Sequence, residues 1–151
     1  MERFEKFTFL MTSVSRNIRR IKTEEMARWN LKSHHLSCIY YLYVNKSLTL
    51  TKLCKTCNED KANISRSVEY LEENGFLTHK GDVSKKYRAP FVLTEKGESL
   101  GKALKERIDQ VLSDASFGIS DEDRQIMYDC LERINDNLCS LANEYKKENG
   151  K

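Results

Sequence analysis

Proline occurs once and glycine six times among 151 residues, and no long apolar run is present. So little proline and glycine argues against disordered, collagen-like and linker-rich chains. Because no stretch approaches the roughly 20 apolar residues of a membrane span, we expect no membrane association. A chain of this length corresponds to about one domain, and it can bury enough surface to fold without disulfides.

Cysteine occurs five times, an odd number without the spacing of a small disulfide-rich scaffold. At the amino end, the short apolar segment 7–14 contains hydroxyl residues and is followed by three arginines. It lacks the small-residue cleavage site of an export signal. We therefore expect a cytoplasmic protein with reduced thiols.

The formal net charge of +3 hides an uneven distribution along the chain. Residues 1–32 hold eight Lys or Arg against four acids, and residues 52–88 hold eight against six. Residues 106–136 instead hold three against nine, which is typical of a solvated helix face. The basic middle of the chain is therefore the segment that most suggests an anionic partner.

Apolar residues recur every three or four positions in six segments, which is the spacing of amphipathic helices. Polar capping residues and a glycine mark where several of these segments begin or end. The pattern predicts a long helix from Phe4 through Ile21, a helix between Asn30 and Asn45, a third capped by Thr49 or Thr51, a fourth capped by Asn58 or Asp60 and closed by Gly75, a fifth after Thr94 and a sixth after Ser120.

Between the fourth and fifth helices the pattern changes to β-branched and aromatic residues. These residues fill 76–80 and 87–93, and Gly81 and Asp82 lie between the two segments. We predict a β-hairpin, in which the strand containing Pro90 lies at an edge or is locally irregular. The expected fold class is mainly α with a small β-hairpin wing.

Two short helices joined by a tight polar turn and followed by a hairpin predict a winged helix-turn-helix. In such a unit the second helix presents one face to the DNA major groove. Here that face carries Lys61, Asn63, Ser65 and Arg66. Arginine can bind guanine with two hydrogen bonds, asparagine can do the same for adenine, and serine or lysine can contact phosphate. The alternative is an ordinary solvated helix face.

The hairpin adds a second basic cluster, formed by Lys85, Lys86 and Arg88, with Lys80 on the first strand. Beside a helix that reads DNA, such a cluster favours contact with phosphates or the minor groove. The alternative is that lysines at an edge strand block unwanted strand pairing.

The stretch from Asp60 to Leu77, DKANISRSVEYLEENGFL, is followed after the hairpin by VLTEKG at 92–97. With these motifs the chain resembles the MarR family of bacterial transcription regulators over nearly its whole length. The resemblance implies an obligate homodimer, built from the first, fifth and sixth helices, that binds palindromic operators and usually acts as a repressor. Some members of the family respond to ligands, metals or oxidants.

The resemblance also implies one intertwined domain with three parts. These are an N-terminal dimerisation helix over 1–32, a winged helix-turn-helix over 33–96 and C-terminal dimerisation helices over 97–151.

The family's wing often carries an Asp-x-Arg-Arg signature, whereas this chain has DVSKKYRAP from Asp82. By position the wing arginine corresponds to Arg88, with Lys85 and Lys86 as supporting phosphate contacts.

Trp29 and Tyr40 lie in segments where the family's dimer helices meet the DNA-binding unit, the usual place of a ligand cleft. We consider these two residues a candidate pocket for a small apolar or aromatic effector. The alternative is a purely structural aromatic core.

Cys54 and Cys57 form a CxxC motif without the second pair of a zinc site or the βαβ context of a redox site. We interpret both as helix-turn-helix core residues, with a thiol-redox protein as the alternative. His34, His35 and Cys38 could share a metal ion, but two histidines at a helix start is the favoured interpretation. We therefore predict no metal and no cofactor.

The sequence contains no P-loop, G-x-G-x-x-G, nucleophile elbow or H-E-x-x-H motif, so we expect no enzyme. A winged-helix module used only for protein contacts is a further alternative, but its recognition face and wing would be uncharged. The resulting hypothesis is a homodimeric repressor that binds double-stranded DNA, with a small-molecule effector as a possible partner.

Overall fold

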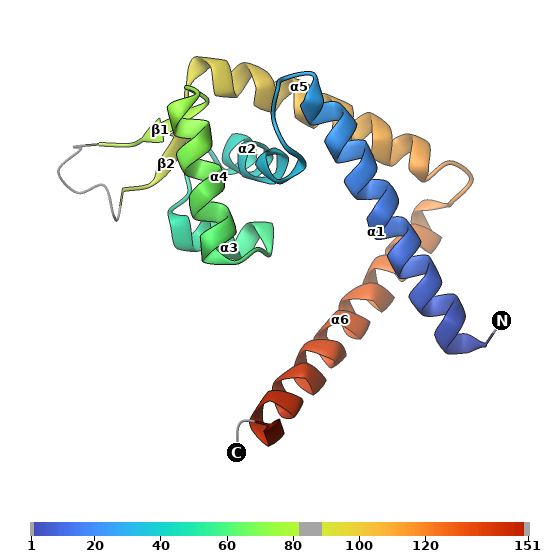
Figure 1. Ribbon diagram of the computed structural model, residues 1–151. Helices are drawn as coiled ribbons and strands as arrows, with labels where there is room; N and C mark the ends of the chain where they lie inside the picture. The colour runs from blue at the N-terminus through green and yellow to red at the C-terminus, as the bar shows by residue number, and fades with distance from the viewer. Residues whose placement is uncertain (1, 82–88, 150–151) are drawn as a thin grey trace. The chain divides into compact units, whose positions relative to one another are not determined.

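The computed structural model describes residues 2–81 and 89–149 (Figure 1). The described chain forms helices and one small sheet, with the bounds α1 Arg3–Ala27, α2 Ser33–Asn45, α3 Leu50–Cys57, α4 Lys61–Glu73, β1 Leu77–His79, β2 Phe91–Leu93, α5 Glu95–Ala115 and α6 Asp121–Asn149. This order confirms the predicted fold class. No described helix combines the length and the apolar character needed to cross a bilayer.

The chain divides into two compact units, one ending at Arg107 and the other beginning at Ile108. The first unit contains α1 to α4, the sheet and the beginning of α5. The second contains the rest of α5 and all of α6. The three-part division expected from the sequence stays a prediction.

Side-chain caps begin the helices at the positions that the sequence indicates. Thr49 Oγ1 accepts a hydrogen bond from the amide of Lys52 at the start of α3, and Asp60 Oδ1 accepts one from the amide of Asn63 at the start of α4. Such a cap satisfies a backbone donor that has no partner inside the helix. Gly75 then adopts φ +73° just beyond α4, as predicted for a closing glycine.

The sheet is a short antiparallel ladder in which Leu77 pairs with Leu93 and His79 with Phe91. Phe91 also exchanges two backbone hydrogen bonds with Leu48, so β2 is paired on both sides at this residue. Pro90 lies just before β2, where its carbonyl accepts a hydrogen bond from the Lys80 amide at 2.8 Å. Within the described residues, the second strand therefore starts at Phe91.

The core of the first unit lies among α2, α3, α4 and the base of the sheet. Its fully buried side chains include Ile39, Leu42, Leu53, Leu71 and Leu77. Burying each of these side chains contributes about 1.5–3 kcal/mol relative to leaving it in water. This core gives the short helices α3 and α4 the stability that they would lack in isolation.

Two glycines let α5 approach the helix-turn-helix closely. A Cβ at Gly97 would lie 1.9 Å from the Phe76 carbonyl oxygen, and one at Gly101 would lie 2.7 Å from the Tyr43 Cβ. Neither distance is compatible with a side chain. Glycine at these two positions therefore lets the start of α5 pack against α2 and against Phe76, which lies between α4 and β1.

The buried residue His35 is part of the capping structure of α2. Its Nδ1 accepts a hydrogen bond from the Lys32 amide at 3.1 Å, and its ring stacks on Tyr70 with a centroid distance of 4.7 Å. Burial lowers the pKa of His35 to about 4, and the neighbouring His34 and Lys32 contribute in the same direction. The native protein therefore holds this imidazole neutral.

We expect His35 to make folding stability depend on pH. An unfolded histidine takes up a proton near pH 6.5, whereas native His35 does so only near 4. The stability that neutral His35 contributes is thus complete above the unfolded pKa and is lost as the pH falls. Between pH 7 and 5 the loss should be roughly 2 kcal/mol.

Urea unfolding of the wild type and of His35→Gln at both pH values measures this loss. Glutamine keeps an acceptor for the Lys32 amide but does not titrate, so the variant should lose less stability on acidification. If the wild type and the variant lost the same stability between pH 7 and 5, His35 would not be the group responsible for the pH dependence.

Candidate nucleic-acid interface

Helix α4 is oriented by its apolar face. Ile64, Val68 and Leu71 are buried, and α4 packs against α2, α3 and β1. Ser67 is buried as well, and its hydroxyl donates to the Asn63 carbonyl at 2.9 Å. Because this face is held by the core, the opposite face of α4 is turned outward (Figure 1).

The outward face of α4 changes its chemical character along the helix. Near its start, Lys61, Ala62 and Arg66 are exposed and Ser65 is half-buried. Near its end, the exposed residues are the acids Glu69 and Glu73. The carboxylates would repel phosphate groups, so only the beginning of α4 is suited to approach a nucleic acid.

Ala62 was missed by the sequence prediction although it belongs to this outward face. It lies one helical turn before Arg66, and its small side chain leaves the start of α4 accessible beside the guanidinium. A small residue one turn before an exposed arginine is the signal that could have identified it.

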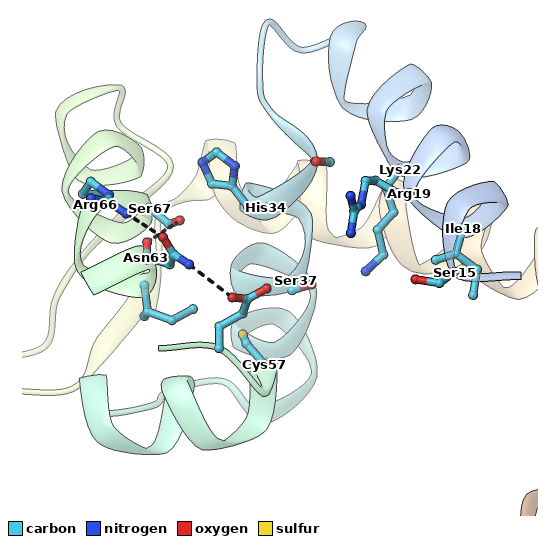
Figure 2. Close-up of a pocket in the computed structure, with 13 residues that line it drawn as sticks. Ser15, Ile18, Arg19, Lys22, His34, Ser37, Cys57, Asn63, Arg66 and Ser67 are labelled. Atoms are coloured by element: carbon cyan, nitrogen blue, oxygen red, sulfur yellow. Dashed lines mark hydrogen bonds between the residues drawn. The ribbon is translucent and has the colours of Figure 1, made fainter. Parts of the chain in front are cut away.

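Asn63 is predicted to contact a base, but its side-chain amide is already occupied in the free protein. Its Nδ2 donates to Asp60 Oδ2 at 2.8 Å and to Glu59 Oε2 at 3.4 Å. Its Oδ1 accepts a hydrogen bond of 2.6 Å from Arg66 Nη2, as Figure 2 shows. The cap of α4 is thus linked through Asn63 to Arg66, which suits Asn63 to orient the guanidinium.

Lys85, Lys86 and Arg88, the predicted wing contacts, lie outside the described residues. The structure describes the residues on either side of this segment, among them Lys80, which directly follows β1. Lys80 is exposed, and β1 packs beside α4. The described base of the hairpin therefore lies next to the candidate recognition helix.

The structure gives different surroundings to Trp29 and Tyr40, the two residues predicted to form an effector pocket. Trp29 lines a pocket of about 280 Å³, where it is joined by Leu104 and by Arg107, which forms an ion pair with Glu25 at 2.8 Å. Tyr40 instead packs edge-on against Tyr41, with ring centroids 5.3 Å apart. An effector beside Trp29 stays a prediction, without Tyr40 among the lining residues of that pocket.

The cysteines of the CxxC motif face different surroundings. Cys57 accepts a hydrogen bond from the buried thiol of Cys38 on α2, which raises the pKa of Cys38 and lowers that of Cys57. Burial raises the pKa of Cys54, which is only partly covered. The thiol that forms a hydrogen bond with Cys57 is therefore Cys38 and not Cys54. Only one of the two thiols in the motif has a lowered pKa.

The histidine cluster is arranged by packing. The rings of His34 and His35 meet edge-on at 4.2 Å, and the Nδ1 of His35 is occupied by the Lys32 amide. Within 2–81 and 89–149, no group of three histidine, cysteine or acidic side chains is placed to hold a metal ion.

Searches of protein-family models and of curated proteins give no match for this chain. Solved structures do match. A MarR family transcriptional regulator from Listeria monocytogenes, complexed with a 26mer DNA, has TM-score 0.77 and 21% identity, with 86% of this chain and 87% of that chain covered.

Two further structures agree in fold. The MepR–DNA complex of S. aureus has TM-score 0.79 and 17% identity, covering 91% of this chain and 99% of that one. NMB1585, a MarR family regulator from Neisseria meningitidis, has TM-score 0.80 and 14% identity, covering 97% of this chain and 100% of that one. This chain therefore has the winged helix-turn-helix fold of the MarR family of transcription regulators.

Proposed function

We propose that this protein is a MarR-type transcription regulator that binds double-stranded DNA as a homodimer. The observation that carries the proposal is the outward face of α4, which is basic and polar only at the beginning of the helix. In helix-turn-helix proteins the first residues of the second helix contact base edges in the major groove. The likeness to two structures solved with DNA supports the same use of this fold.

Arg66 is the side chain best suited to read a base. It is exposed, and its contact with Asn63 reduces the number of conformations that it samples before binding. Its remaining guanidinium donors can bind guanine, while Lys61 and Ser65 are available to phosphates or base edges. Asn63 acts in this proposal as the residue that positions Arg66.

The wing contributes charge in this proposal. Lys85 and Lys86 contact phosphates, and Arg88 enters the minor groove or adds a phosphate contact. Together with the start of α4, these residues give each subunit one site that recognises sequence and one that supplies affinity.

Apolar stripes on α1 and α6 support the homodimer. In the single chain, Leu10 is 44% and Val14 50% exposed on α1, and Leu138 is 53% and Leu141 47% exposed on α6. Exposed apolar stripes of this kind are typical of helices that contact a partner. A two-fold dimer would place two copies of α4 on a palindromic operator, and occupancy of a promoter by the dimer would repress transcription.

Arg66→Ala should weaken binding to the preferred operator by about 1–3 kcal/mol and reduce discrimination at one base pair. Asn63→Ala should produce part of the same loss, because Arg66 is then no longer held in place. The double variant should be little worse than Arg66→Ala alone. Fluorescence anisotropy with operator and scrambled DNA measures these effects.

Glu73→Gln is the matched control for these variants, because it changes α4 at its acidic end. It should leave binding unchanged or strengthen it slightly. Additive losses in the Asn63 and Arg66 variants would show that Asn63 acts independently of Arg66. Full binding by both single variants would overturn the role of α4.

Replacing Lys85 and Lys86 with alanine should lower the affinity for operator DNA and for scrambled DNA by similar factors. The slope of log affinity against log salt should fall by roughly one for each phosphate that the variant no longer neutralises. Titrations across a salt series test this expectation. A loss confined to the operator would instead show that the wing reads sequence.

Leu138→Asp should dissociate the homodimer, since a carboxylate would be buried without a partner in an apolar interface. Ser140→Asp places the same charge on the opposite face of α6 and should leave the dimer intact. Sedimentation equilibrium measures both. A dimer of unchanged affinity in Leu138→Asp would exclude this face of α6 from the interface.

A further inference from the structure

Two cysteine thiols from different helices meet in the core of the first unit. Cys38 lies in α2, and Cys57 is the last residue of α3. The Cys38 thiol donates a hydrogen bond to the Cys57 sulfur. Both cysteines are free. A hydrogen bond between two thiols therefore connects α2 with the end of α3, at a place where a covalent bond between the same atoms would also connect them.

The two thiols differ in their access to solvent. Cys38 is fully buried, whereas Cys57 is half-buried. Cys57 also lines a cavity of about 420 Å³ between α1, α2 and α4, and Figure 2 shows it among the residues around this cavity. A small solute such as a hydroperoxide can therefore reach the sulfur of Cys57, while Cys38 lies behind it in the core.

The hydrogen bond also makes the two thiols chemically unequal. The donation from Cys38 lowers the pKa of Cys57, and Lys22 acts in the same direction, against the opposing effects of burial and Glu59. The same hydrogen bond, together with burial, raises the pKa of Cys38. Because the thiolate is the form that attacks an oxidant, Cys57 is the nucleophile of the pair and Cys38 keeps its proton.

We propose that Cys57 and Cys38 form a redox site that reacts with hydroperoxides, with Cys57 as the attacking thiol and Cys38 as the resolving thiol. In the first step the Cys57 thiolate attacks one peroxide oxygen, so that an S–O bond forms and the O–O bond breaks. The other oxygen leaves as hydroxide or alkoxide and takes a proton from solvent. Cys57 is then a sulfenic acid.

In the second step the Cys38 sulfur attacks the sulfur of the Cys57 sulfenic acid. An S–S bond forms, the S–O bond breaks, and the hydroxyl group leaves as water with the proton of Cys38. Two thiols are thereby oxidised to one disulfide, and the hydroperoxide is reduced to water or an alcohol. Cys38 needs no long movement, because its thiol already contacts the Cys57 sulfur.

The disulfide joins α2 to α3 within one chain. It lies directly before Asn58, which has φ +53°, and close to Asp60, which caps α4. The site is distinct from the CxxC pair, since burial raises the pKa of Cys54. Neither step involves DNA, so the inference goes beyond the proposed function, and a protein that bound no operator would leave it intact.

Peptide mapping of the full chain after brief treatment with hydrogen peroxide or cumene hydroperoxide tests the site. Remaining thiols are alkylated, and the protein is digested with trypsin without reduction. Lys55 lies between Cys54 and Cys57, so the digest separates the three thiols into peptides 33–46, 53–55 and 56–61. We expect peptides 33–46 and 56–61 to be joined by a disulfide that dithiothreitol reduces, in a protein that runs as a monomer on a non-reducing gel.

A disulfide that joins peptides 53–55 and 56–61 would overturn the proposal, because Cys54 would then be the resolving thiol. Disulfides formed only between chains, or an unchanged Cys57, would overturn it as well. The free thiol of Cys57 should be lost about tenfold faster than that of Cys54, since more of Cys57 is thiolate at neutral pH. Equal rates would contradict the activation of Cys57.

Variants separate the roles of the two thiols, with dimedone present to trap sulfenic acid. Cys38→Ala should carry a dimedone adduct on Cys57 and no disulfide, whereas Cys57→Ser should form neither. Cys38→Val keeps more of the buried volume and replaces Cys38→Ala if that variant does not fold. Cys54→Ser is the matched control, and it should form the disulfide as the wild type does. A wild type that carries the adduct on Cys57 without any disulfide would overturn the role of Cys38.

Discussion

The burial of one face of α4 is the constraint on which the rest of the candidate interface depends. Ile64, Val68 and Leu71 occupy the core shared with α2 and α3, so rotation of α4 about its axis would expose apolar side chains. That face fixes which residues point outward. The basic start and acidic end of the outward face then limit contact with DNA to the beginning of the helix.

Arg66 connects several features of the first unit. It extends from the outward face of α4, it is tied to the helix cap through Asn63, and it also lines the cavity bounded by α1 and α2. The position of this guanidinium therefore depends on the cap of α4 as well as on the surface that α4 turns toward α1.

Local patterns predicted the secondary structure well because its causes are local. Thr49, Asp60 and Gly75 act on backbone groups within one helical turn, and their roles follow from their own chemistry and from neighbouring residues. The surroundings of the predicted effector pocket depend instead on residues that are distant in sequence. Trp29 and Tyr40 are eleven positions apart in segments joined by a turn, and no periodicity indicates that α5 supplies the other wall beside Trp29.

The sequence by itself determined the order of the helices, the hairpin, the caps and the polar character of Lys61, Ser65 and Arg66, since period and residue type encode them. Tertiary structure decided what those side chains do. Only packing shows that Cys57 meets Cys38 from another helix. Only packing brings Arg19 and Lys22 to the same cavity as Arg66, because contacts between residues more than forty positions apart depend on how whole helices fit together.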